Sequence, residues 1–219
     1  MKLRVGLVGL GEAWEQRHRS ALRTLADRFE VRAVCDQVAH RAEQAAAEFG
    51  AVAVDGFREM VHREDIDAVL MLAVQWYGAM PIYAACETGK AVYCAAGLDL
   101  GAEEAQLVRR RVEQAGIAFV AEFPKRQAPA TLRLKELIVT ELGTPQLLFC
   151  HQRSAARSRA NHQGWPPRPA AIRELVELVD WCTYVVGWSP TAVTGVIHKR
   201  GCPARSEERR VGKECRSRW

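Results

Sequence analysis

Apolar runs alternate with amphipathic segments over the first 121 residues of the chain. Six short runs lack internal alternation and are typical of buried parallel strands: residues 5–8, 30–35, 51–54, 67–74, 91–94 and 117–121. Between them, apolar residues recur at helical spacing, and several segments end at glycine, a common helix terminator. We expect helices at residues 40–49, 57–63, 79–88 and 102–115, and one directly after the first strand. Strands separated by helices predict an α/β fold with a doubly wound parallel sheet.

The pattern changes after Pro124. Helical spacing predicts two further helices, at residues 131–142 and 172–186. Residues 146–152 and 191–198 are expected to be strands, and the polar, proline-rich stretch 154–169 an exposed loop. Two strands are too few to close a sheet of their own. We therefore expect residues 124–204 to be the beginning of a truncated second α/β (α+β) domain.

The last part of the chain does not follow a structural pattern. Residues 205–219 have no hydrophobic period and resemble the in-frame translation of a common sequencing adapter. We expect them to be a non-native tail, so that the natural protein continues past Ala204; the alternative is a natural, solvated basic tail. The stretch holds six of the 31 Lys and Arg residues and three of the 26 Asp and Glu residues, so without it the formal net charge falls from +5 to +2. This balance gives no reason to expect nucleic-acid binding.

The seven cysteines form no CxxC pair, and Cys35, Cys94 and Cys150 lie in apolar runs where a free thiol behaves as a small buried hydrophobe. This usage favours a reducing cytoplasm and argues against a disulfide framework. No run is long and apolar enough to span a membrane, and the chain enters a predicted core strand without a signal peptide. The histidines show no paired metal spacing, so we predict no metal site.

A glycine turn follows the first predicted strand. In dinucleotide-binding folds the first glycine permits a tight turn, and the second lets the backbone approach a pyrophosphate at the helix N-terminus. A tryptophan stands where the fingerprint has its third glycine, which normally allows close packing of helix and strand. The residues expected to bind the cofactor here are Gly9, Leu10, Gly11, Glu12, Ala13 and Trp14.

An acidic residue, Asp36, ends the second predicted strand, 25 residues after Gly11. At this place an acid is expected to hydrogen-bond the adenosine ribose hydroxyls and to repel a 2′-phosphate. We therefore predict NAD as the cofactor rather than NADP, with Arg41 nearby as a contact that softens the preference. The alternative is a helix-capping aspartate in an ordinary α/β unit.

The sequence resembles the Gfo/Idh/MocA oxidoreductases, the glucose–fructose oxidoreductase and inositol dehydrogenase family, over residues 3 to about 199. Besides the glycine turn, the resemblance rests on Val34-Cys35-Asp36 with Arg41-Ala42, and on residues 65–69, 87–94 and 121–130. It implies an NAD(P)-binding Rossmann domain over residues 1–123 and a second domain with the substrate site and often the oligomer interface. Hydride transfer to or from a sugar, polyol or related metabolite, and a homo-oligomer of the complete protein, are therefore expected. Ala73 and Val74, where the family has Thr-Pro, are expected cofactor contacts.

The family's acid–base residues are missing. Its catalytic lysine falls on Ala96, which has no titratable group, and its aspartate and histidine fall on Arg173 and Glu177. Glu177 is the candidate catalytic base; the alternative is a structural glutamate paired with Arg173, one helical turn away. Lys125 and Arg126 are candidates to bind the substrate; the alternative is solvated charge at a domain junction.

Three hypotheses follow from these departures. The first is an NAD(P)-dependent oxidoreductase with a rearranged proton-transfer site. The second is a dinucleotide-binding protein without catalysis, which has a regulatory or assembly role. The third is that only the first domain folds in this chain.

Overall fold

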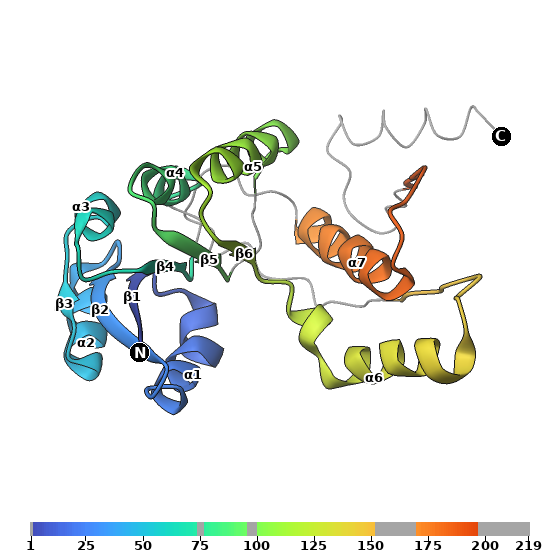
Figure 1. Cartoon of the computed structure of the whole chain (residues 1–219), viewed down its shortest axis with the longest axis horizontal. Coiled ribbons are helices and arrows are strands. Elements are labelled where there is room, and N and C mark those ends of the chain that lie inside the picture. Colours follow the sequence, from blue (N-terminus) through green and yellow to red (C-terminus); the bar gives the residue numbers. More distant parts are fainter. Residues whose placement is uncertain (1, 74–76, 96–99, 152–169, 197–219) are drawn as a thin grey trace, which may run out of the picture. The chain divides into compact units, whose positions relative to one another are not determined.

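The computed structural model describes residues 2–73, 77–95, 100–151 and 170–196. The chain divides into two units, Met1–Val186 and Gly187–Trp219. In the first unit, six parallel strands form one sheet in the order β3-β2-β1-β4-β5-β6 (Figure 1). The strands are β1 (Leu3–Val8), β2 (Phe29–Cys35), β3 (Val52–Ala53), β4 (Ala68–Met71), β5 (Ala91–Cys94) and β6 (Phe119–Ala121). The predicted doubly wound parallel sheet is confirmed.

Helices cover both faces of the sheet. They are η1 (Trp14–His18), a π-helical turn that continues into α1 (Arg19–Thr24), then α2 (Ala39–Phe49), α3 (Phe57–His62), α4 (Met80–Glu87) and α5 (Ala102–Ala115). One buried cluster combines the strands with Met60, Ile82 and Val108 from α3, α4 and α5. The cluster on the other face includes Trp14 and Leu22 from η1 and α1. The alternation along β1 separates these two clusters, as the period of two in a strand requires.

The part of the first unit after the sheet is helical. A short 3₁₀ turn, η2 (Pro124–Gln127), leads into α6 (Pro129–Leu137), which continues as a π-helical turn, η3 (Ile138–Leu142). Helix α7 (Ala170–Val186) packs against them, since the Trp181 indole donates to the Thr131 hydroxyl at 2.9 Å. Both predicted helices of this region are therefore confirmed.

The strands predicted after the sheet are wrong for the residues that the structure describes. Residues 146–151 and 191–196 form neither strand nor bridge, and residues 152, 197 and 198, like the predicted loop 154–169, lie outside the described ranges. An extended segment becomes a strand only by pairing with a neighbour, and here Phe149 and Val196 remain 89% and 79% exposed. The apolar runs alone could not reveal that partners are missing. The described part of the second unit, residues 187–196, has no helix or strand.

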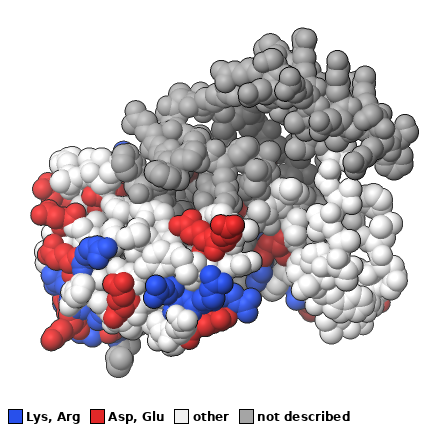
Figure 2. Space-filling model, turned by 90° about the horizontal axis from the view of Figure 1, so that it is seen from above, with Lys and Arg blue, Asp and Glu red and all other residues white. Residues whose placement is uncertain are grey.

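Strand β4 ends at Met71 rather than at residue 74. The Leu72 N–H still donates to the Val8 carbonyl at 2.9 Å, after which the chain leaves the sheet at Ala73. No helix among the described residues meets the length and hydropathy that a membrane crossing requires. Figure 2 shows acidic and basic side chains interspersed over the left part of the visible face, whereas the described part on the right is mostly white, that is, made of other residues.

An ion pair joins the beginnings of β1 and β4. The Asp67 carboxylate accepts hydrogen bonds from the Arg4 backbone N–H at 2.9 Å and from the Arg4 guanidinium at 2.6 and 3.0 Å. These bonds lower the pKa of Asp67 to about 2. Because an unfolded aspartate titrates near pH ~3.9, the pair stabilises the fold above that pH, and its contribution is lost as the pH falls towards about 2.

Asp67→Asn should remove this acid-sensitive part of the stability. We expect the free energy of unfolding in urea to depend less on pH, between about pH 5 and 2, in Asp67→Asn than in the original chain. The matched control is Asp27→Asn, because the Asp27 side chain is 74% exposed, and it should keep the original slope. Equal slopes for Asp67→Asn and the original chain would contradict the account.

Candidate dinucleotide-binding site

The carboxyl ends of β1, β2 and β4 meet at the middle of the sheet, where the glycine turn lies. Gly9 has a φ of +75°, and a Cβ on it would lie 2.7 Å from the Ala73 carbonyl oxygen. A Cβ on Gly11 would lie 2.9 Å from the Ala73 Cβ. The Gly9 N–H donates to the Cys35 carbonyl at 2.8 Å. Both glycines are therefore required by close approach of the backbone to the end of β4.

Asp36 connects the glycine turn to the end of β2. One carboxylate oxygen accepts the Leu10 N–H at 2.7 Å, and the other accepts the Val38 N–H at 2.9 Å. Asp36 is half-buried, and each of its oxygens keeps a further lone pair with which it can accept a hydroxyl hydrogen bond. The turn and the acid, which are far apart in sequence, are thus brought together as the sequence predicts.

Trp14 packs inside the fold rather than obstructing it. Its side chain is only 2% exposed, and its ring centroid lies 5.6 Å from that of Phe49. The same buried cluster contains Ala42, Ala45 and Ala46, the inward face of α2. Because these side chains are small, the indole fits between η1 and α2 without the third glycine of the fingerprint.

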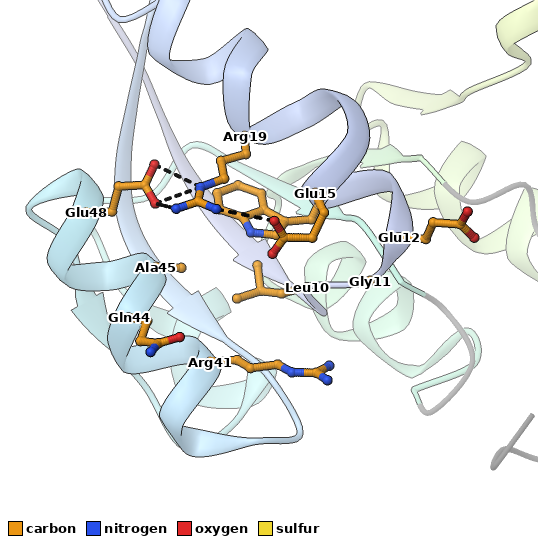
Figure 3. A pocket seen from close by; sticks show the side chains of 10 residues that line it. Leu10, Gly11, Glu12, Glu15, Arg19, Arg41, Gln44, Ala45 and Glu48 are labelled. Atoms are coloured by element: carbon orange, nitrogen blue, oxygen red, sulfur yellow. Dashed lines mark hydrogen bonds and ion pairs between the residues drawn. The ribbon is translucent and has the colours of Figure 1, made fainter. Parts of the chain in front are cut away.

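A pocket of about 570 Å³ opens beside the turn, between η1 with α1 and α2 (Figure 3). Arg19 bridges two acids at its edge, donating to Glu48 at 2.8 Å and to Glu15 at 3.3 Å. The hydrogen bond from Arg19 lowers the pKa of Glu48. Arg41 extends from α2 along the opening. The lining residues are Leu10, Gly11, Glu12, Trp14, Glu15, Arg19, Arg41, Gln44, Ala45 and Glu48.

Of the remaining candidate residues, some are described by the structure and others are not. Ala73 lies against Gly9 and Gly11 of the glycine turn, whereas Val74 and Ala96 lie outside the described residues. Glu12 is exposed and accepts a hydrogen bond from Gln16 at 2.8 Å. Among the described residues, no cluster of His, Cys, Asp or Glu has the composition of a metal site.

The candidate base and one candidate substrate residue form an ion pair. Lys125 Nζ lies 3.7 Å from a Glu177 carboxylate oxygen, and both side chains are more than one-third exposed. The pair connects η2 to α7. The predicted alternative, a pair of Glu177 with Arg173, involves a side chain outside the described residues.

Arg126 is held by several groups at once. Its guanidinium makes two hydrogen bonds to the Asp180 carboxylate, one of them from Nε at 2.8 Å, and these raise the pKa of Arg126. It also lies over the rings of Phe123 and Tyr184, at 5.1 and 5.3 Å from their centroids. Arg126 therefore connects η2 to α7 as well, and its guanidinium presents a fixed cation there.

A polar cluster at the end of β6 was not anticipated from the sequence. Arg17 donates to both carboxylate oxygens of Glu122, at 2.6 and 3.0 Å, and His18 Nε2 lies 3.6 Å from the same carboxylate. Burial acts to raise the pKa of Glu122, but His18 and Arg17 together lower it overall. Burial also raises the pKa of the neighbouring Tyr93 to about 12. Because Arg17 and Glu122 are 105 positions apart in the sequence, no local pattern could have indicated this cluster.

A parallel sheet with a glycine turn and an acid at its switch point defines an α/β protein of the dinucleotide-binding class. Residues 3–123 match the Gfo/Idh/MocA family, described as an oxidoreductase family with an NAD-binding Rossmann fold. The chain belongs to this family of oxidoreductases.

Similar curated proteins include inositol dehydrogenases. The chain is 29% identical over 177 residues to inositol 2-dehydrogenase 3 of Saccharopolyspora erythraea, covering 80% of this chain and 52% of that protein. It is 29% identical over 152 residues to inositol 2-dehydrogenase of Salmonella typhimurium, covering 68% of this chain and 45% of the relative. The chain therefore spans about half the length of the curated relatives it matches.

The chain is also similar to solved structures of oxidoreductases. An NAD binding oxidoreductase from Klebsiella pneumoniae matches with a TM-score of 0.58 and 29% identity, over 66% of this chain and 41% of that one. The scyllo-inositol dehydrogenase from Lactobacillus casei, solved with bound NAD(H) and scyllo-inositol, matches with a TM-score of 0.57 and 25% identity, over 64% and 41%.

Proposed function

We propose that the complete protein transfers hydride between NAD and a sugar, polyol or related small metabolite. The observation that carries this proposal is the bond from the Leu10 N–H to Asp36, which fixes an acid beside the glycine turn at the carboxyl edge of the sheet. The names of the inositol dehydrogenase relatives support a polyol as the substrate class. A cytoplasmic homo-oligomer is part of the same proposal, as is a boundary between two domains after residue 123.

The residues of the turn fit a dinucleotide. A Cβ at Gly9 or Gly11 would meet Ala73, so glycine leaves the backbone free to approach a pyrophosphate. Asp36 would accept hydrogen bonds from the adenosine ribose, and its charge disfavours a 2′-phosphate. Glu12 on the adjoining pocket adds to this repulsion and Arg41 at the opening opposes it, whereas Glu15 and Glu48 are paired with Arg19. When bound, NAD supplies the hydride-accepting nicotinamide.

The chain's own residues must then bind the substrate and move a proton. We propose that Lys125 and Arg126 bind substrate hydroxyls and that the Glu177 carboxylate accepts the proton. The ion pair between Lys125 and Glu177 places a donor beside an acceptor, and both remain open to solvent. The same residues could instead serve only to join η2 to α7. Measuring whether the protein turns over a substrate distinguishes the catalytic role from this structural role.

The second candidate function is dinucleotide binding without catalysis. It is favoured by the residues at the three family acid–base positions, Ala96, Arg173 and Glu177, and by the engagement of Arg126 with Asp180. The experiment that separates the two functions measures NADH formation at 340 nm with a panel of inositols, sugars and polyols, using the complete gene product. Turnover that falls in Glu177→Gln while NADH binding is unchanged would support the oxidoreductase. NADH binding without turnover on any member would support the binding protein.

Asp36→Asn tests the cofactor preference. The variant keeps a carbonyl oxygen for the Leu10 N–H but removes the charge, so the ratio of the NADPH and NADH dissociation constants should fall by about tenfold or more. The matched control, Glu64→Gln, removes an exposed charge before β4, at the opposite end of that strand from the turn. Fluorescence titrations of both cofactors into the three chains give the ratio, and an unchanged ratio in Asp36→Asn would contradict the assignment.

A further inference from the structure

Two cysteines in the helical part of the first unit lie next to each other. The Sγ atoms of Cys150 and Cys182 are 3.5 Å apart, although the two residues are 32 positions apart in the sequence. Cys182 belongs to α7, and Cys150 to the segment without regular secondary structure that follows η3. Figure 1 shows this gold segment turning back after α6 to pass α7. A disulfide needs an S–S distance of about 2 Å, so a small movement of this segment would bring the two sulfurs within bonding distance.

We propose that Cys150 and Cys182 are a reversible disulfide site, oxidised by a small-molecule disulfide such as glutathione disulfide. This site is independent of the proposed hydride transfer. Such a disulfide differs from the permanent disulfides of a secreted protein, because it forms and breaks with the redox state. Transient disulfides of this kind occur in reducing compartments.

The surroundings give the two thiols different roles. Cys150 is followed by an exposed histidine and preceded by Phe149, which is 89% exposed, so a small disulfide can approach it. Burial raises the pKa of Cys182 to about 11, while the nearby Lys125 acts in the opposite direction. Cys182 is therefore mostly a thiol at neutral pH, and Cys150 makes the first attack.

The exchange proceeds in two balanced steps. The Cys150 thiolate, having given its proton to water, attacks one sulfur of glutathione disulfide; that S–S bond breaks, and one glutathione thiolate leaves and is protonated. The Cys182 thiolate, formed by loss of its proton, then attacks the Cys150 sulfur of the mixed disulfide and releases the second glutathione. The protein loses two electrons and two protons, and glutathione disulfide gains both.

Closing this bond would tie the segment after η3 to α7, the helix that carries Glu177 and Asp180. The other described cysteines are placed differently. Cys35 and Cys94 are buried in the sheet, and Cys86 lies half-buried on α4. Cys86 therefore provides a matched control, because it is a described thiol of intermediate exposure on another element.

Peptide mapping tests the proposal directly. The full chain is equilibrated with mixtures of oxidised and reduced glutathione, quenched with acid, alkylated and digested with trypsin. Cleavage after Lys and Arg places Cys150 in residues 136–153 and Cys182 in residues 174–199, each without a second cysteine. We expect these two peptides to be joined under oxidising mixtures and separate under reducing ones, with this pairing exceeding any other by on the order of tenfold.

Three variants make the result specific. Cys182→Ser should leave a glutathione adduct on Cys150, Cys150→Ser should abolish the joined peptides, and Cys86→Ser should leave them unchanged. Free or glutathione-bound Cys150 and Cys182 in the oxidised original chain would overturn the proposal. A preference of either thiol for another cysteine, in the same chain or in a second copy, would overturn it as well.

Discussion

Gly9→Ala is expected to reduce NADH binding by about a hundredfold or more and to lower the free energy of unfolding by about 3 kcal/mol. The φ of +75° at Gly9 disfavours any side chain by roughly 1–2 kcal/mol. The new Cβ would also lie 2.7 Å from the Ala73 carbonyl oxygen, and relieving that overlap by backbone movement costs about 1–3 kcal/mol. The same movement displaces the Leu10 N–H from Asp36.

Gly50→Ala is the matched control for Gly9→Ala. Gly50 has a similar φ of +65°, but a Cβ there would meet nothing within 4 Å. Only the backbone strain remains, so we expect a loss of about 1 kcal/mol and unchanged NADH binding. Urea unfolding and a fluorescence titration of NADH measure both effects. Equal losses in the two variants would show that the close approach to Ala73 is unimportant.

Trp14→Ala is expected to lower the free energy of unfolding by about 3–5 kcal/mol, as for other buried tryptophans. The Trp14 side chain is 2% exposed and fills the space between η1 and the alanines of α2. Trp14→Gly restores the third glycine of the fingerprint, yet we expect it to destabilise the fold at least as much, because α2 keeps its small side chains. Neither variant should bind NADH more tightly than the original chain.

The control for the loss of an indole is Trp188→Ala. Trp188 is 68% exposed, so its removal should change the unfolding free energy by less than about 0.5 kcal/mol. A Trp14→Gly chain that is as stable as the original and binds NADH more tightly would show that Trp14 obstructs the site. That result would contradict the packing described for η1 and α2.

The sheet could be predicted because its strands are buried on both faces and read as unbroken apolar runs. The exact ends of the strands could not be predicted as well. Strand β3 has only two residues, and β4 ends at Met71 because the chain must leave the sheet to meet the glycine turn. The local patterns at residues 146–152 and 191–198, the second of which alternates, also favour strands, but strand formation depends on pairing with a neighbour, which no local pattern reports.

In the candidate site, too, the features set by local sequence position could be predicted, and those set by tertiary packing could not. The positions of Gly9, Gly11 and Asp36 beside one another were predictable because all three follow the ends of parallel strands. The accommodation of Trp14 depends on which face of α2 points towards η1, and the Arg17–Glu122 pair joins residues 105 positions apart. Likewise, the sequence suggested Arg173, on the same helix, as a structural partner for Glu177, but no local pattern indicated the described ion pair with Lys125 on another element.

We propose that this chain holds NAD at the glycine turn and selects it over NADP through Asp36. The most direct test is a parallel fluorescence titration of NADH and NADPH into the folded, unmodified chain. We predict that NADH binds at least about tenfold more tightly than NADPH, because the Asp36 carboxylate, held by the Leu10 and Val38 N–H groups, disfavours a 2′-phosphate. A folded chain that binds neither cofactor, or binds NADPH more tightly, would contradict the account.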